Sequence, residues 1–393
     1  MGLAAAAAML AGCSAFATPR PAPAHDPSLA PPGPVGYVVC SNAVTPVELS
    51  TRTAEADIPL GLAGAPALGN FAIAASADGR WAYVVTSNGV VPGPKPAAGG
   101  VVPPATAPAT PATASPPVPP PGVGVQNVVI PIDLVTQTAA RPIEIPGQGG
   151  THAIVVLPGG RTVLAASGST IVPVDAISRR VGTPLDLGPG HTIFGMVLDP
   201  RRAALYALVA GGVFPVETAK GTAGVEIPTG LSVSSVYSPH GIAITGDGAT
   251  LYVVGQGGTD FGGRVLPIVV SSRATLPTAG FDRFGIADPA AVAITPDGSS
   301  LLVVDSANNW VNPVPLATFS DPPPPVRLPQ QAAAASTSGT QHPTDIVLGP
   351  GRTGAFIVVG FDAVQPYDPG LQTFGRAIPV CSGAASMAVA PAP

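Results

Sequence analysis

The sequence predicts an all-β fold: a seven-bladed β-propeller of four-stranded antiparallel blades, in which the N-terminal and C-terminal strands share one blade. Three observations carry this prediction. An apolar-x-Pro-apolar segment occurs seven times, tight turns join pairs of apolar strands, and one blade lacks its innermost strand until the C-terminal segment is counted. The 393 residues would, by length alone, also permit two or three domains.

The N-terminal segment predicts export. Residues 1–13, MGLAAAAAMLAGC, resemble a bacterial lipoprotein signal that is cleaved before a lipidated cysteine, here Cys13. The basic residues that normally open such a signal are absent, so we expect the true translation start to lie upstream. The alternative is a chance cysteine in an alanine-rich leader. Residues 14–35 are rich in Pro and Ala and predict an extended tether to the propeller domain at 36–393.

The repeat is clearest in the third strand of each blade, which NAVTPVEL at 42–49 exemplifies. Its proline recurs at Pro46, Pro131, Pro173, Pro215, Pro267, Pro313 and Pro366. From Pro131 onward the spacings run from 42 to 53 residues, the length of one blade. Because proline has no N–H for a ladder, we expect a local bend or bulge to accommodate it in every blade.

Asp-Gly pairs at 78, 247 and 297 predict the turns that join the first and second strands of a blade. The first proline spacing, 85 residues, is anomalous because it also contains a Pro/Ala run at 89–124. Such a run forms no core, so we expect a disordered insertion between the second and third strands of the first blade. It is either a slack low-complexity insert or a docking segment.

Ring closure requires the C-terminal segment ASMAVAPAP to be the innermost strand of the blade formed by GYVVCS, NAVTPVEL and EADIPLG. Cys40 then ends the second strand of that blade, and Cys381 precedes its innermost strand. In an oxidising compartment these positions predict a disulfide across the closure. Two buried free thiols are the alternative.

Four histidines lie at or near the start of an innermost strand, in four different blades, so we expect them on the mouth face of the ring. Candidate ligand-binding residues on this face are His152, His191, His240, His342, Asp288, Asp345 and Trp310. Such a set could serve as a metal site or as general acids and bases. Alternatively, polar residues there only bond exposed backbone groups. Two well-aligned histidines do not make a metal site, so we expect no metal and no cofactor.

The composition argues against several functions. Charged residues make up 10% of the chain without runs, and the net charge is -5, so we expect no nucleic-acid partner. The sequence contains no Gly-x-Ser-x-Gly elbow, zinc spacing, phosphate loop or dinucleotide fingerprint. No catalytic residue is assigned.

The segments ITPDGSSLLVVDSANNWVNPV at 294–314 and ITGDGATLYVVG at 244–255 resemble the YVTN-repeat seven-bladed propellers, and the resemblance covers residues 36–393. The apolar-x-Pro-apolar third strand departs from that family, as do degenerate turns near 158, 200 and 350. The resemblance implies the fold. It transfers no catalytic residue, because such repeats occur in surface-layer, adhesion-like and envelope proteins and beside enzymes.

These observations lead to two functional expectations. The first is a monomeric, lipid-anchored module outside the cytoplasm of a bacterium, which binds an envelope protein, a glycan or a small ligand at the mouth of the ring. The second is an envelope hydrolase or lactonase-like enzyme that uses His and Asp residues at the same place. A purely structural wall component is hard to separate from the first.

Overall fold

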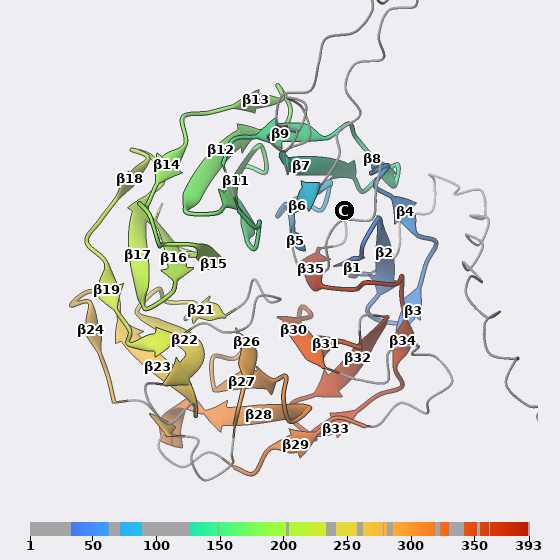
Figure 1. Cartoon of the computed structure of the whole chain (residues 1–393). Coiled ribbons are helices and arrows are strands. Elements are labelled where there is room, and N and C mark those ends of the chain that lie inside the picture. The colour runs from blue at the N-terminus through green and yellow to red at the C-terminus, as the bar shows by residue number, and fades with distance from the viewer. Residues whose placement is uncertain are drawn as a thin grey trace, which may run out of the picture.

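The computed structural model forms a ring of seven antiparallel sheets around a central axis (Figure 1). The structure describes residues 33–62, 71–88, 126–147, 149–201, 204–232, 241–257, 262–277, 279–280, 286–318, 323–329, 342–351, 354–360 and 362–391. The predicted seven-bladed β-propeller is therefore confirmed. The leader, residues 14–32 of the predicted tether and the insertion at 89–124 lie outside the described residues, whereas Val35, the last residue of the predicted tether, is the first residue of β1.

The innermost strands surround the axis, and the outer strands follow in sequence order. From blade 1 to blade 7 the innermost strands are β5 (Phe71–Ala75), β10 (Ile154–Val156), β15 (Ile193–Leu198), β21 (Ile242–Ile244) with β20 (Leu231–Ser232), β26 (Pro289–Ile294), β30 (Pro343–Leu348) and β35 (Ser386–Ala390). The second strands are β6 (Trp81–Asn88), β11 (Thr162–Ser167), β16 (Ala204–Val209), β22 (Thr250–Gly257), β27 (Ser300–Asp305), β31 (Ala355–Val359) and β1 (Val35–Val39). The third strands are β7 (Gln126–Asp133), β12 (Thr170–Asp175), β17 (Gly212–Glu217), β23 (Gly263–Val269), β28 (Trp310–Pro315), β32 (Ala363–Asp368) and β2 (Ala43–Glu48).

The outermost strand is split into two short segments in six blades. These pairs are β8 (Thr138–Ala139) and β9 (Ile143–Ile145), β13 (Arg180–Val181) and β14 (Leu185–Asp186), β18 (Thr222–Ala223) and β19 (Ile227–Pro228), β24 (Ala274–Thr275) and β25 (Ala279–Gly280), β33 (Thr373–Phe374) and β34 (Ile378–Pro379), and β3 (Thr53–Ala54) and β4 (Ile58–Pro59). Blade 5 has one such segment, β29 (Val326–Arg327), and a 3₁₀ turn, η2 (Leu316–Thr318).

The third-strand proline explains the split. Tyr37 pairs with Pro46 and the register of β1 with β2 runs past it without a shift. The Pro46 carbonyl accepts a hydrogen bond from Glu55 N–H at 2.8 Å, so the missing proline N–H would also have pointed to the outermost strand. That strand leaves the ladder between β3 and β4. The predicted irregularity therefore lies in the fourth strand, beside the proline, and the third strand stays regular.

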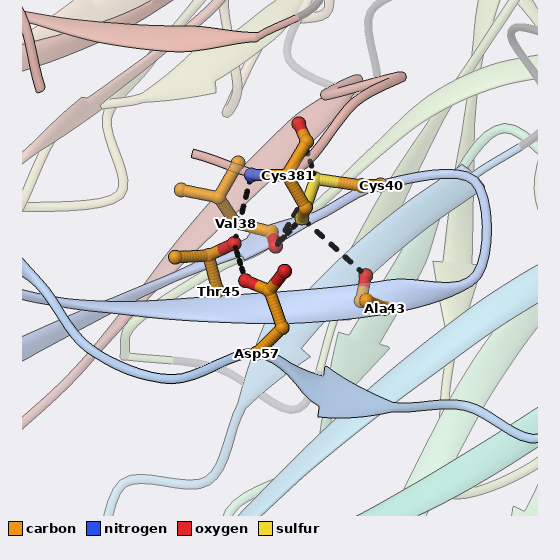
Figure 2. The surroundings of a disulfide bond; sticks show 6 residues. All are labelled: Val38, Cys40, Ala43, Thr45, Asp57 and Cys381. Carbon is orange, nitrogen blue, oxygen red and sulfur yellow. Dashed lines mark hydrogen bonds between the residues drawn. A yellow bond between two sulfur atoms is a disulfide. The ribbon is translucent and has the colours of Figure 1, made fainter. Parts of the chain in front are cut away.

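The ring closes as the sequence predicts. β35 pairs with β1 from Val35 opposite Ala390 to Val39 opposite Ser386, which gives the sheet order β3-β2-β1-β35. Cys40 and Cys381 form a disulfide with their Cα atoms 5.9 Å apart. Cys381 N–H also donates to Thr45 Oγ1 at 3.0 Å, and the Thr45 hydroxyl donates to Asp57 Oδ1 at 2.6 Å (Figure 2). One covalent bond and a hydrogen-bonded chain thus join the two ends.

The core lies between blades because strand residues alternate between two faces. Val128, Ile130 and Ile132 of β7 pack toward blade 7, whereas Val129 packs toward blade 2. Buried Val, Ile and Leu side chains of this kind fill the spaces between neighbouring sheets. Each Å² of apolar surface buried between the sheets contributes about 25 cal/mol to stability, so the packing of neighbouring blades stabilises the ring.

The predicted Asp-Gly turns are present on the face opposite the mouth. Thr295 Oγ1 donates to Asp297 at 2.6 Å, and Ser299 N–H donates to the same carboxylate at 3.0 Å. Gly298 has a φ of 67°, which glycine adopts without strain. Among the described residues, no helix is long and apolar enough to cross a membrane.

Candidate functional site

The mouth face carries the starts of the innermost strands and the connections between second and third strands. Of the predicted ligand-binding residues, the structure places His152, His191, His342, Asp288, Asp345 and Trp310 at this end of their strands or connections. His240 lies outside the described residues, as does the predicted lipidation site Cys13.

His152 is held between two blades. It precedes β10 and is 7% exposed, and its ring stacks on Phe194 of blade 3 with centroids 5.9 Å apart and planes 23° apart. Phe194 is half-buried and is the extra residue of a β-bulge at the start of β15, where the register shifts between Ile193 and Gly195. A bulge turns a side chain away from the regular alternation of a strand. The sequence reading missed Phe194, because a bulge leaves no mark in the residue pattern.

A buried hydrogen-bond network fixes the loop that precedes His152. Asn127 Nδ2 donates to Gly149 O at 3.1 Å and to Ser167 Oγ at 2.6 Å, and Asn127 is 1% exposed. Gly147 has a φ of 123°, and a Cβ there would collide with the Ser167 side chain. Position 147 therefore requires glycine, and Asn127 supports the backbone at Gly149. Asn127 was also missed from the sequence, where it reads as an ordinary strand residue.

His191 lies farther out on the same face. Its Nε2 is 3.7 Å from Glu226 Oε2, and its ring meets Phe214 edge-on with centroids 5.1 Å apart. Both partners belong to the outer half of blade 3. The nearby Asp186 carboxyl has a pKa below its usual range because Gly188 N–H and the Ser169 hydroxyl donate to it, with a smaller contribution from His191. Through these contacts, His191 packs the connection between blades 2 and 3 against the outer strands of blade 3.

His342 and Asp288 lie at equivalent positions of blades 6 and 5. His342 Nδ1 is 2.9 Å from the Ser306 carbonyl oxygen, which can only accept, so this nitrogen carries the proton of the neutral ring and Nε2 keeps its lone pair. Ser306 N–H donates to the Asp288 carbonyl at 2.9 Å, and its hydroxyl donates to the Pro343 carbonyl at 2.7 Å. The loop after β27 therefore positions both predicted residues.

Two buried carboxylates support these connections. Asp305 accepts from Ala287 N–H at 3.1 Å and from Asn308 Nδ2 at 2.8 Å, and Trp310 pairs with Asp305 across β27 and β28. Asp345 accepts from Ile346 N–H at 2.8 Å and from Met387 N–H of blade 7 at 3.0 Å. Both side chains are fully buried. Asp345 therefore joins the innermost strands of blades 6 and 7.

The three described histidines have three different sets of neighbours: Phe194 for His152, Glu226 and Phe214 for His191, and Ser306 for His342. Within the described part of the chain, no three His, Cys, Asp or Glu side chains are grouped so that they could hold a metal ion. The described residues provide an aromatic pair on blades 2 and 3, His152 with Phe194, and a hydrogen-bonded set of loops on blades 5 and 6 that includes Ser306 and His342.

Comparisons with known proteins agree with the fold. No family model and no curated protein matches the chain. Among solved structures, the chain is similar to the hydrazine synthase of Kuenenia stuttgartiensis, with a TM-score of 0.59 and 16% identity over 83% of this chain and 91% of that chain. It is also similar to a functionally unknown protein from Desulfotomaculum acetoxidans DSM 771, with a TM-score of 0.56 and 12% identity over 91% and 98%. At these identities the similarity shows the fold alone.

Proposed function

We propose that this chain is a non-catalytic binding module of a bacterial envelope, anchored by lipid at Cys13, which takes an envelope protein, a glycan or a small ligand on its mouth face. The observation that carries the proposal is the His152 loop. Asn127 donates to Gly149, and Gly147 has a backbone conformation that favours glycine, so both support the approach of the chain to His152, whose ring stacks on the half-buried Phe194. Preorganised aromatic surface is typical of binding sites.

The location is supported by the disulfide, since such bonds persist in oxidising compartments and are rare in the cytosol. The resemblance of residues 1–13 to a lipoprotein signal and the resemblance to YVTN-repeat envelope proteins point the same way. Labelling cells with a palmitate analogue tests the anchor. We expect the label on the wild-type chain and none on Cys13→Ser; a labelled variant, or an unlabelled wild type, would remove the anchor from the proposal.

Binding at the mouth is tested with purified protein on a glycan array and with small envelope metabolites. Each binder is then measured against the double variant His152→Ala/Phe194→Ala and against the control Phe374→Ala, whose ring packs on Tyr367 in the outer part of blade 6. We expect the double variant to lose binding and the control to keep it. Equal binding by both variants would move the site away from this face.

Deletion of residues 89–124 tests whether that insertion recruits a protein partner.

The second candidate is an envelope hydrolase, and one observation favours it. His342 donates from Nδ1 to the Ser306 carbonyl, which leaves Nε2 to act as a base, and Ser306 N–H in turn donates to the Asp288 carbonyl. Lactone and ester turnover by wild type and by His342→Ala distinguishes the two functions. Turnover that disappears in the variant would establish the enzyme; no turnover by pure wild-type protein would remove it.

A further inference from the structure

The inner rim of the mouth is uneven, and the β-bulges make it so. Register shifts occur at the start of β15, β26 and β30, and the extra residues are Phe194, Ala290 and Thr344. Ala290 and Thr344 are 2% and 3% exposed, whereas Phe194 is half-buried. The fold thus accepts alanine or threonine at this position. A partly exposed phenylalanine in blade 3 is not required for folding and offers aromatic surface beside the axis.

Charge distinguishes the two faces of the ring. Among the described residues, the mouth end carries eight carboxylates and two arginines, namely Asp57, Glu144, Asp186, Glu226, Asp288, Asp305, Asp345 and Asp362 against Arg264 and Arg327. Three further charges, Glu55, Arg141 and Arg376, lie between the two segments of an outermost strand and belong to neither end. The opposite end is nearly balanced, with Glu48, Asp78, Asp133, Asp175, Asp199, Glu217, Asp247, Asp297 and Asp368 against Arg52, Arg80, Arg161, Arg179, Arg180, Arg201, Lys220 and Arg273. The mouth therefore attracts cations and repels anions, and this effect weakens as salt is added.

We propose that the mouth face binds an organic cation of the quaternary ammonium class, with its methyl groups against the exposed part of the Phe194 ring. The proposal rests on the proposed binding function and names the ligand class for the same site. A quaternary ammonium is attracted by the negative face of an aromatic ring. It is weakly hydrated compared with a primary amine, so little water has to be removed. The carboxylates across the axis on blades 5 and 6 add long-range attraction without an ion pair.

Choline and its uncharged isostere 3,3-dimethylbutan-1-ol provide a matched pair of probes, because they differ in charge and hardly in shape. Binding to the full-length protein is measured by saturation-transfer NMR and titration at fixed ionic strength. We expect choline to bind about 5-fold to 30-fold more tightly than the isostere, the factor that corresponds to a cation–π contact. Added NaCl should weaken choline binding and leave the isostere unchanged.

The variant Phe194→Leu keeps apolar volume and removes the ring, while Phe374→Leu makes the same change far from the mouth. We expect Phe194→Leu to abolish the preference for choline with an unchanged far-UV spectrum, and Phe374→Leu to retain it. Equal affinity for the two probes, or a preference that survives Phe194→Leu, overturns the cation proposal. If neither probe binds while a glycan or another ligand still binds in a His152-dependent way, the ligand class is wrong and the binding function stands. If no ligand binds at the mouth, both fail.

Discussion

Reduction of the Cys40–Cys381 disulfide should cost a large share of the stability of the propeller. The bond spans 341 residues of sequence, so breaking it returns conformational freedom to nearly the whole unfolded domain. The chain-entropy relation gives about 5.8 kcal/mol for a loop of this size, and measured disulfides usually contribute about 2–5 kcal/mol. For a domain of roughly 300 residues, each kcal/mol changes Tm by about 1.5 °C, so we expect Tm to fall by about 3–9 °C.

The assay is urea unfolding of oxidised and reduced wild-type protein, which carry the same side chains and differ only in the cross-link. The double variant Cys40→Ala/Cys381→Ala should be less stable than reduced wild type, because Cys40 is 1% exposed and its sulfur fills buried space. The β1–β35 ladder remains in all three forms, so we expect the folded ring to persist on reduction. Oxidised and reduced proteins within about 0.5 kcal/mol of each other would refute the reasoning.

Three further predictions concern the turns, the tyrosines and the mouth loop. The hydroxyl of Thr295 and the N–H of Ser299 lower the pKa of Asp297 to about 2. The contribution of the Asp297 carboxylate to folding stability should therefore be complete above about pH 4 and be lost as the pH falls toward 2. An NMR titration that gives this carboxyl group an ordinary aspartate pKa would contradict the prediction. Burial raises the pKa of Tyr83 to about 12, so the free energy of unfolding should fall as the pH rises from 10 to 12. Absorbance at 295 nm should show that the Tyr83 phenol ionises above pH 10. Ionisation of Tyr83 near pH 10 while the circular dichroism stays native would contradict the prediction. Asn127→Ala should cost about 1–3 kcal/mol in urea unfolding and weaken every mouth ligand, since its amide supports Gly149; unchanged ligand affinity would separate the loop from binding.

The repeat was readable from the sequence because each blade uses the same local chemistry. Alternating apolar residues, the recurring proline and the Asp-Gly turns determine strands and turns within a few residues, and the structure confirms them. Ring closure also followed, since Cys40 and the C-terminal strand had only one place in a seven-bladed count. These features depend on neighbours along the chain or on the number of repeats, and both are visible in a single sequence.

The mouth was predictable only as a region. All the described histidines lie there, yet their partners are distant in sequence: Phe194 of blade 3 stacks on His152 of blade 2, and Glu226 beside the outermost strand of blade 3 meets His191. The split of the outermost strand has the same origin, because it depends on which way Pro46 points in its sheet. Register between strands and the re-aiming of a side chain by a bulge are set by tertiary packing. Residue spacing does not encode them.

The outermost strand also determines how the ring can meet other proteins. Leu60, Thr229 and Val380 donate inward to their own blades, so the preceding Pro59, Pro228 and Pro379 face outward with no N–H to offer a neighbouring strand. Three other blades have an exposed, charged residue that faces outward on the outermost strand. Asp186 and Arg327 each precede a residue whose N–H donates inward, and Glu144 lies between two inward-facing residues. Prolines and charges on sheet edges prevent pairing with another chain. Six of the seven perimeter edges are therefore closed to β-strand addition, so a partner that extends a sheet would have to use the remaining edge, in blade 4.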